Sequence, residues 1–312
     1  MRFSSVNTNC LTFGIIKLNY LGGMKQILTL SMLLFLMFSC GGGKSVEPHA
    51  NDELLYEVSD SIMAEELLRK FSTRENPETG VLVRDIALHF LGTPYVAHTL
   101  ETGADEKMVM NLREMDCTTF AENCLALART AGMKKPGFAK FAEQLEKIRY
   151  RGGLRNGYGS RLHYFSDWIY DNDSRKMVKS ISQEMAHMMV PNQVNFMSTH
   201  PDSYPVLKGN RELITELTAI EKEISGRMTW FVPRNQMAEA EDQILDGDII
   251  GITSGIEGLD VSHVVIATHQ GTSLHFIHAS SRENKVVVSD QTLRQYLNSS
   301  KMATGIMVAR PL

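Results

Sequence analysis

The sequence lacks the features that mark several common classes of protein. Basic residues are not in excess, because 32 Lys and Arg stand against 36 Asp and Glu and give a formal net charge of −4. No stripe of basic side chains alternates with aromatic ones, which argues against nucleic acid as a partner. No internal repeat or low-complexity tract is evident. With 312 residues, 43% of them hydrophobic, the chain can form one large globular domain or two small ones.

Long apolar runs are also missing. The most pronounced run, 27–38, follows Met24-Lys25-Gln26 and ends at Ser39-Cys40. It is shorter than the roughly 20 residues that a transmembrane helix needs. A basic start, a short apolar core and small residues at the exit are typical of a secretory signal. The sequence therefore predicts an exported protein.

The cysteine that directly follows this run resembles the lipid-accepting residue of a bacterial lipoprotein signal. In that interpretation residues 1–40 are the leader, residues 1–23 look like an over-extended reading frame, and 41–51 form a Gly-rich tether. Cys40 would carry the lipid and become the mature N-terminus, so we expect a periplasmic protein anchored to the outer membrane. A cleaved signal with an incidental cysteine is the alternative.

Cysteines are scarce in the body of the chain, which holds only Cys117 and Cys124. On a predicted helix, seven residues separate two Cα atoms by roughly 10 Å, which is beyond the span of a disulfide. Both thiols should therefore stay free, although the protein is expected in an oxidising compartment. Nucleophilic catalysis is one explanation for such a thiol.

The order of the predicted elements favours an α+β fold. Apolar spacing predicts helices in the first half of the chain, and short β-rich runs between turn residues follow Met228. Because the βαβ alternation of a parallel sheet is missing, we expect a helix packed on a small antiparallel sheet. The predicted helices are 52–71, 81–91, 118–130, 138–149 and one near 212–224, and the predicted strands are 229–232, 248–252, 263–268, 274–278 and 285–288.

One cysteine stands at a predicted helix start. Asp116 is a good N-cap and places Cys117 in the first turn, where the helix dipole favours thiolate over thiol. We therefore expect a lowered pKa for Cys117. The alternative is that Cys117 is a small buried residue, as most free cysteines are. Cys124 lies two turns further along and is predicted to be a core residue.

Four histidines follow in the β-rich half, at positions 263, 269, 275 and 278. Strand alternation puts His275 and His278 on opposite faces, so only one of them can face His263. A Cys and a His oriented by a third polar group form the arrangement of papain-like catalysis. Structural roles for these histidines are one alternative, and a zinc site is another. Because the close-paired ligand spacing of zinc sites is missing, we predict no metal and no cofactor.

Motifs in a fixed order make residues 81–312 resemble the NlpC-type cysteine peptidases and amidases of bacterial cell walls. The resemblance implies a papain-like core in which a cysteine-bearing helix packs on the sheet, with Cys117 as nucleophile, His263 as base and His278 as the orienting residue. It also implies one domain, 52–312, with helical insertions near 97–114 and 150–240. The motifs are Leu91-Gly92-Thr93-Pro94-Tyr95, Met115-Asp116-Cys117, Asp246-Gly247-Asp248-Ile249-Ile250, Ser262-His263-Val264-Val265-Ile266 and Phe276-Ile277-His278-Ala279-Ser280.

The chain departs from the usual pattern around these motifs. Val96-Ala97-His98 stands where Trp-Gly-Gly is common, and Met115 replaces a small Ser or a Phe. Together with the insertions, this resembles a divergent branch associated with N-acetylmuramoyl-L-alanine amidase activity. The resemblance thus implies a hydrolase of muropeptides, the soluble fragments of peptidoglycan. The alternatives are a γ-D-glutamyl-diaminopimelate endopeptidase and a lipoprotein that only binds wall fragments.

The substrate wall is predicted from residues near the nucleophile and within the large insertion. Aromatic side chains stack on sugar faces, and an Arg can hold carboxylates. The Tyr95 hydroxyl is a candidate oxyanion donor. The alternative for the insertion is a packed connector with a buried Trp. The predicted substrate-binding residues are Tyr95, Asp116, Arg161, His163, Tyr164 and Trp168.

Overall fold

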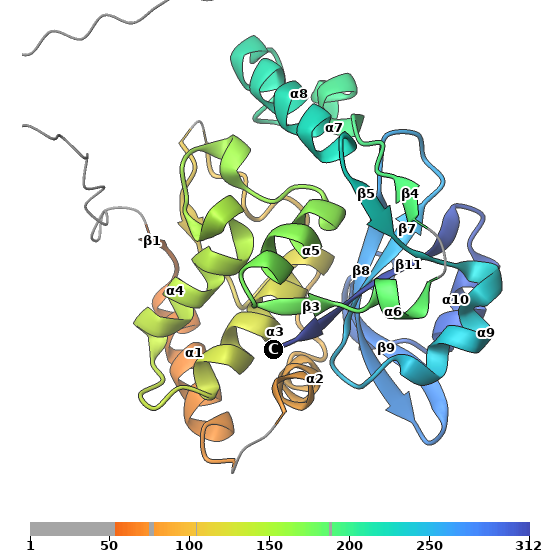
Figure 1. The fold of residues 1–312 in the computed structure, drawn as a ribbon. Helices are drawn as coiled ribbons and strands as arrows, with labels where there is room; N and C mark the ends of the chain where they lie inside the picture. Colours follow the sequence, from red (N-terminus) through yellow and green to blue (C-terminus); the bar gives the residue numbers. More distant parts are fainter. Residues whose placement is uncertain (1–53, 75–77, 104, 187–188) are drawn as a thin grey trace, which may run out of the picture. The chain divides into compact units, whose positions relative to one another are not determined.

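The computed structural model describes residues 54–74, 78–103, 105–186 and 189–312 (Figure 1). The predicted leader, the tether and Cys40 lie outside these described residues. Within the described part of the chain, no helix is both long enough and apolar enough to cross a membrane.

A cluster of helices surrounds the one that carries the predicted nucleophile. Helix α3 packs against α1, α2 and α4, and almost all of its residues after the first two are buried. Its Ala-rich sequence lets the neighbouring helices approach closely, and Phe120, Leu125 and Leu127 fill the space between them. The helices are α1 (Val58–Phe71), α2 (Thr79–His89), α3 (Cys117–Ala131) and α4 (Phe138–Arg149).

The C-terminal half forms a seven-stranded antiparallel sheet. Its strand order is β10-β9-β8-β7-β11-β3, and β6 also pairs with β11. The α+β prediction is therefore confirmed. The sheet has seven strands, whereas five strands were predicted. The strands are β3 (Val178–Ser180), β6 (Val232–Pro233), β7 (Ile249–Ser254), β8 (Val261–Gln270), β9 (Ser273–Ser280), β10 (Lys285–Val288) and β11 (Ala303–Pro311).

Strand alternation divides the apolar residues of this sheet between two cores. Val264 and Ile266 join the cluster formed with the helices, whereas Val265 and Ala267 join the cluster on the opposite face. Figure 1 shows α1 to α5 on one side of the sheet and α9 and α10 on the other. The central strands are consequently buried on both faces. The helices named here for the first time are α5 (Phe165–Ser174), α9 (Met237–Ala240) and α10 (Leu293–Ser299).

The large insertion is anchored to this core. Its strand β3 pairs with the end of β11, and its outer part has an apolar cluster of its own that includes Tyr164, Met197 and Leu217. The remaining short elements are β1 (Leu54–Leu55), which pairs with β2 (Met108–Val109), and β4 (Met189–Pro191), which pairs with β5 (Met228–Trp230). The other helical segments are α6 (Ser182–Met185), α7 (Phe196–Thr199), α8 (Arg211–Ser225) and 3-10 turns at 151–153, 158–160, 201–203, 234–236 and 241–243.

Two predicted elements differ from the structure by more than two residues at an end or in number. The predicted strand 229–232 is two strands, because β5 closes a hairpin with β4 and β6 then joins β11 of the main sheet. The first predicted helix begins at Val58, after the short strand β1.

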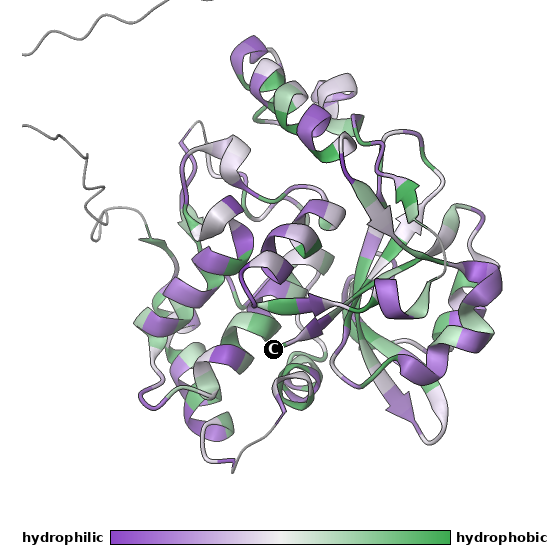
Figure 2. Cartoon of the chain, in the orientation of Figure 1, coloured by the Kyte–Doolittle hydropathy of each residue, from purple (hydrophilic) through white to green (hydrophobic). Residues whose placement is uncertain are grey.

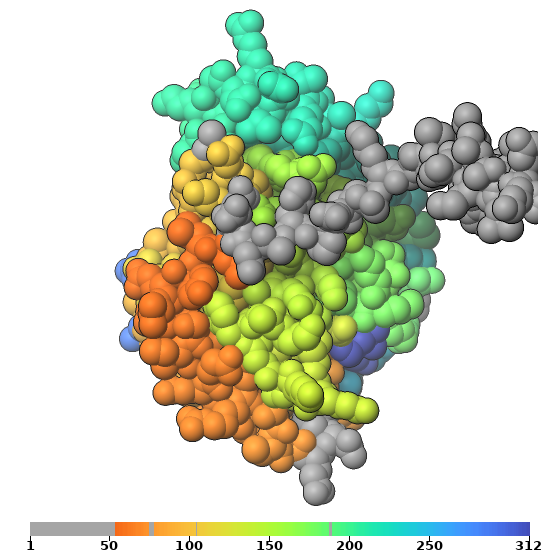
Figure 3. Space-filling view, turned by 90° about the vertical axis from the view of Figure 1, so that its left-hand side faces the viewer, coloured from red at the N-terminus to blue at the C-terminus, as the bar shows by residue number. Residues whose placement is uncertain are grey.

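The helices place polar side chains on the surface and apolar side chains in the core. In Figure 2, α4 and α8 change from purple to green around their axes, as expected for helices that bury one side only. Figure 3 shows the face covered by the orange and yellow-green helical segments, with the teal segment around α8 at its upper end. Little of the blue sheet is visible from this side, so the helices and the insertion cover this flank of the domain.

Candidate active site

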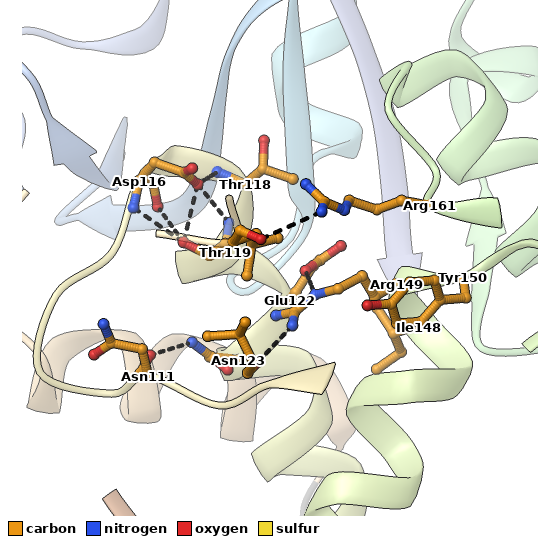
Figure 4. Close-up of polar contacts among 12 residues, drawn as sticks. Asn111, Asp116, Thr118, Thr119, Glu122, Asn123, Ile148, Arg149, Tyr150 and Arg161 are labelled. Carbon is orange, nitrogen blue, oxygen red and sulfur yellow. Dashed lines mark hydrogen bonds and ion pairs between the residues drawn. The ribbon is translucent and has the colours of Figure 1, made fainter. Parts of the chain in front are cut away.

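The first turn of α3 is fixed by its N-cap. Asp116 Oδ1 accepts hydrogen bonds from the backbone N–H groups of Thr118, at 3.0 Å, and Thr119, at 2.8 Å. The Thr119 hydroxyl accepts the backbone N–H of Asp116 at 3.0 Å, which completes a reciprocal cap (Figure 4). Cys117 is therefore held as the first residue of the helix, as the sequence predicted.

A buried ion pair also fixes helix α3. Glu122 and Arg149 are 3% and 2% exposed, and Arg149 Nε lies 2.7 Å from Glu122 Oε2 (Figure 4). Arg149 also donates to the backbone oxygen of Val109 at 2.6 Å. This contact ties α3 to α4 and β2, so it fixes the helix that presents Cys117.

The electrostatic environment of Cys117 differs from the expectation. Burial raises the pKa of its thiol to about 11, and the charge of the neighbouring Asp116 acts in the same direction. A hydrogen bond from the backbone of Val264 opposes this shift only in part. The predicted lowering by the helix dipole is thus wrong, because desolvation and the N-cap carboxylate outweigh it. At neutral pH Cys117 is a thiol.

Two histidines form a hydrogen-bonded pair on adjacent strands. His263 Nε2 lies 2.6 Å from His278 Nδ1, and the two rings are inclined by 73°. His275 is on the opposite face of β9, where its Nδ1 donates to the Ser289 backbone oxygen at 2.9 Å. The strand alternation that the sequence indicated therefore brings His278, and not His275, to His263.

Both rings of the pair are neutral at neutral pH. Burial lowers the pKa of His263 to about 3, helped by the nearby His278, and burial also lowers the pKa of His278 to about 4. When His263 accepts a proton, both of its ring nitrogens carry hydrogen. Its Nε2–H then donates to His278 Nδ1, which carries no hydrogen in the neutral ring. His263 Nδ1 is then the atom available to take a proton from a thiol.

The helix that carries Cys117 packs on the two strands that carry the histidine pair. Helix α3 contacts both β8 and β9, and Val264, whose backbone bonds the Cys117 thiol, is the residue after His263. Tyr95 lies nearby, since burial and then the charges of Cys117 and Asp116 raise its pKa. Tyr296 on α10 is also close to this cysteine, because burial and then Cys117 raise its pKa. No motif in the sequence pointed to Tyr296.

A cavity of about 150 Å³ adjoins Asp116, the residue before the predicted nucleophile. Most of its wall comes from the two insertions that the sequence predicted. His98 in this wall has a φ of 62°, a left-handed conformation at the last position of the Trp-Gly-Gly motif that this chain replaces. The lining residues are His98, Leu100, Glu101, Asp116, Tyr158, Arg161, His163, Tyr164, Met197, Tyr204 and Leu259.

The predicted wall residues differ in what they can do. Arg161 pairs with Glu101 at 2.8 Å and with Glu106 at 2.6 Å, so its guanidinium is not free to hold a substrate carboxylate as predicted. Trp168 does not line the cavity: it is 1% exposed and stacks on Phe165 in the core. The alternative, a buried Trp in a packed connector, describes this residue.

His163 and Tyr164 do line the cavity, and both are tied to the insertion. His163 Nε2 donates to the Tyr158 backbone oxygen at 2.9 Å, and burial and then Arg161 lower its pKa to about 3. The Tyr164 hydroxyl donates to Glu221 at 2.7 Å. Sequence reasoning missed Glu101, Tyr158 and Tyr204, which carry no motif.

Among the residues that the structure describes, no group of three or more His, Cys, Asp or Glu side chains is arranged to hold a metal ion. The histidine pair is accounted for by its own hydrogen bond.

The raised pKa of Cys117 leads to a prediction for its reactivity. Iodoacetamide attacks the thiolate, so the alkylation rate should rise about tenfold per pH unit from pH 7 towards 10 without a plateau. Labelling followed by peptide mass spectrometry measures this rate at Cys117. The variant Cys117→Ala is the control, since Cys124 is fully buried and its pKa is also raised. A plateau that starts below pH 8 would instead reveal a stable thiolate.

Comparison with known proteins identifies related folds. A family model described as AmiA-like, N-acetylmuramoyl-L-alanine amidase-like, matches residues 85–306. The crystal structure of an N-acetylmuramoyl-L-alanine amidase from Bacteroides uniformis is 38% identical, with a TM-score of 0.72, and the match covers 75% of this chain and 98% of that one. No curated protein is similar enough to count as a match.

Two further solved structures share the fold. A Bacteroides fragilis protein provisionally named a xylanase is 38% identical, with a TM-score of 0.69 and coverage of 72% of this chain and 99% of that one. Protein LPG0564 from Legionella pneumophila is 21% identical, with a TM-score of 0.60 and coverage of 81% and 95%. At that identity the Legionella protein supports the fold alone.

Proposed function

Because the chain belongs to the AmiA-like family of N-acetylmuramoyl-L-alanine amidase-like proteins, we propose that it is a cysteine amidase of bacterial cell-wall fragments. It hydrolyses the amide between N-acetylmuramic acid and L-alanine. The observation that carries this proposal is the His263–His278 pair on the strands against which α3 presents Cys117.

Because the Cys117 thiol and both imidazole rings are neutral before the reaction, each proton transfer can be assigned to a residue. His263 Nδ1 takes the thiol proton as Cys117 Sγ attacks the lactyl carbonyl, and His278 accepts a hydrogen bond from the resulting imidazolium. The tetrahedral intermediate collapses to a thioester when the C–N bond breaks, and His263 returns the proton to the departing L-alanine amine. Water, deprotonated by His263, then hydrolyses the thioester and frees the thiol.

The oxyanion of each tetrahedral intermediate needs hydrogen-bond donors. The backbone N–H of Cys117 is available at the helix start, where the helix dipole stabilises negative charge. The Tyr95 hydroxyl is the second candidate, because Tyr95 lies close enough for Cys117 to influence its pKa.

Product analysis tests this function against the alternatives. Purified protein is incubated with N-acetylmuramoyl-L-alanyl-γ-D-glutamyl-diaminopimelate, and the products are identified by mass spectrometry. The amidase releases N-acetylmuramic acid and the intact tripeptide. An endopeptidase on the same core would release muramyl dipeptide and diaminopimelate, and a binding protein would leave the substrate whole. Either of these last two results would overturn the proposal.

We also propose that the protein is exported and held at the outer membrane by a lipid on Cys40. The predicted effect of Cys40→Ala is loss of both the lipid and membrane association. Metabolic labelling with a radioactive fatty acid, followed by membrane fractionation, measures both, and Cys117→Ala is the control that keeps the label. Soluble, unlabelled wild-type protein would contradict lipidation.

A further inference from the structure

The cavity beside Asp116 carries more negative than positive charge. Arg161 is the guanidinium on its wall, and three carboxylates surround it or adjoin the same space: Glu101, Glu106 and Asp116. Burial alone would lower the pKa of Arg161, but Glu106 and then Glu101 raise it, so its charge is matched within the wall. A carboxylate on a ligand would therefore find no free guanidinium on the wall of this cavity.

The wall also has unused hydrogen-bonding capacity. Glu101 Oε2 is buried and has no hydrogen-bond partner among the described residues. Tyr158, which is only 4% exposed, and Tyr204 line the same cavity and each carries a hydroxyl. Burial, then Glu221 and Glu101, raise the pKa of Tyr204 to about 12, so this hydroxyl keeps its proton. These groups suit a ligand that offers hydroxyl and amide hydrogens.

The cavity wall also has aromatic and apolar surface beside its polar groups. Tyr164 and Tyr204 contribute aromatic surface, as does Tyr158, whose ring also contacts Arg161 and His163. Leu100 and Leu259 contribute apolar surface. Aromatic faces pack on the apolar faces of sugar rings, while the hydroxyls at the ring edge reach polar partners. An uncharged, hydroxylated ring is therefore the chemistry that this wall accommodates.

The two candidate scissile amides differ in whether they offer such a group. In the muramyl–L-alanine amide, one half is an uncharged N-acetylated sugar and the other is an acidic peptide. In the γ-D-glutamyl–diaminopimelate amide, both halves carry carboxylates. Only the first bond therefore has a half that the acidic cavity can admit without repulsion.

We propose that Glu101 is a specificity-determining residue, whose carboxylate accepts hydroxyl hydrogens from the uncharged sugar half of the substrate and repels a carboxylate in the same place. The inference rests on the proposed amidase function and names the residue that selects its bond. The selection acts on binding, because Glu101 lies on the cavity wall and is not part of the Cys–His pair.

The test compares two blocked peptides. Each carries L-alanyl-γ-D-glutamyl-diaminopimelate, one with an N-acetylmuramoyl group and the other with a succinyl group that places a carboxylate where the sugar would bind. Hydrolysis of the amide before L-alanine is measured for wild type, Glu101→Gln and the matched control Glu106→Gln. Glu106→Gln also removes a negative charge that pairs with Arg161, but Glu106 does not line the cavity. If the succinyl peptide is not cleaved, its inhibition constant against the muramyl substrate replaces the rate.

The expected result is a change of preference in one variant only. Glu101→Gln should raise KM for the muramyl peptide about tenfold and shift the ratio of kcat/KM values towards the succinyl peptide by at least about tenfold. Glu106→Gln should change both substrates alike. An unchanged ratio in Glu101→Gln, while wild type cleaves the muramyl amide, would overturn this inference alone. Release of diaminopimelate by the wild type would overturn the proposed function itself.

Discussion

Replacing Cys117 with alanine is expected to abolish hydrolysis of the muramyl tripeptide, with a loss in kcat of about 10⁴ or more, as for other covalent nucleophiles. The fold should survive, because the Asp116 cap and the Glu122–Arg149 pair hold the start of α3 without the thiol. Release of N-acetylmuramic acid gives the rate, and thermal unfolding checks the fold.

Cys124→Ala is the matched control for this substitution. Cys124 is on the same helix, is fully buried and packs in the core among the helices. Losing its sulfur leaves a small cavity that should cost about 1 kcal/mol of stability while most of the activity remains. If Cys124→Ala were inactive and Cys117→Ala active, the assigned nucleophile would be wrong.

His278→Ala is expected to lower kcat by about 10² to 10⁴ and to leave measurable activity, because His263 remains as a base without its orienting partner. The 2.6 Å hydrogen bond between the rings would be lost, and the His263 imidazolium would have no acceptor for its Nε2–H. Turnover at saturating substrate measures the effect.

Two further variants separate orientation from simple disruption of the strand. His275→Ala on the same strand removes a ring that bonds only the Ser289 backbone, so it should be nearly normal. His278→Asn offers an amide oxygen that can replace Nδ1 as acceptor, so its kcat should lie between wild type and His278→Ala. Equal losses for His275→Ala and His278→Ala would point to strand packing instead.

Local sequence signals were enough to predict the start of α3 and the pairing of the histidines. An Asp before a helical pattern is an N-cap because its side chain satisfies exposed N–H groups, and the structure shows Asp116 in this role. Alternation along a strand depends only on the backbone, which is why His278 and not His275 could be expected beside His263.

The environment of these residues could not be predicted in the same way. The pKa of Cys117 depends on how deeply the thiol is buried and on the charge of Asp116, and burial is a property of the whole fold. The pairing of Arg161 with Glu101 joins residues 60 positions apart, and no local pattern indicates it. The sequence therefore indicated candidate site residues but not the charge balance of the cavity.

Several elements of the fold were missed for a related reason, among them β11 and α10. The last predicted strand ends at Val288, whereas β11 lies between β7 on one side and β3 and β6 on the other, one strand in from the edge of the sheet. Its Ile306-Met307-Val308 core is a short apolar run with no clean alternation, because the strand is buried on both faces. Helix α10, which brings Tyr296 towards Cys117, is only seven residues long.

On this account, the insertions give the core of the domain its own binding site. The helix, the sheet and the Cys–His pair would serve any cysteine amidase or peptidase. The segments around Glu101, Tyr158 and Tyr204 close a cavity beside Asp116 and contribute to its charge. On this account, catalytic power resides in the core and the choice of bond in the insertions.

The central claim is that Cys117 forms a thioester with the muramoyl group, and acid-quenched mass spectrometry tests it most directly. Wild-type protein is mixed with excess muramyl tripeptide, quenched in acid during steady-state turnover and digested. The account predicts an N-acetylmuramoyl adduct on the peptide that contains Cys117, and no adduct in Cys117→Ala. An adduct that contains L-alanyl-γ-D-glutamate, or one on Cys124 or any other residue, would contradict it.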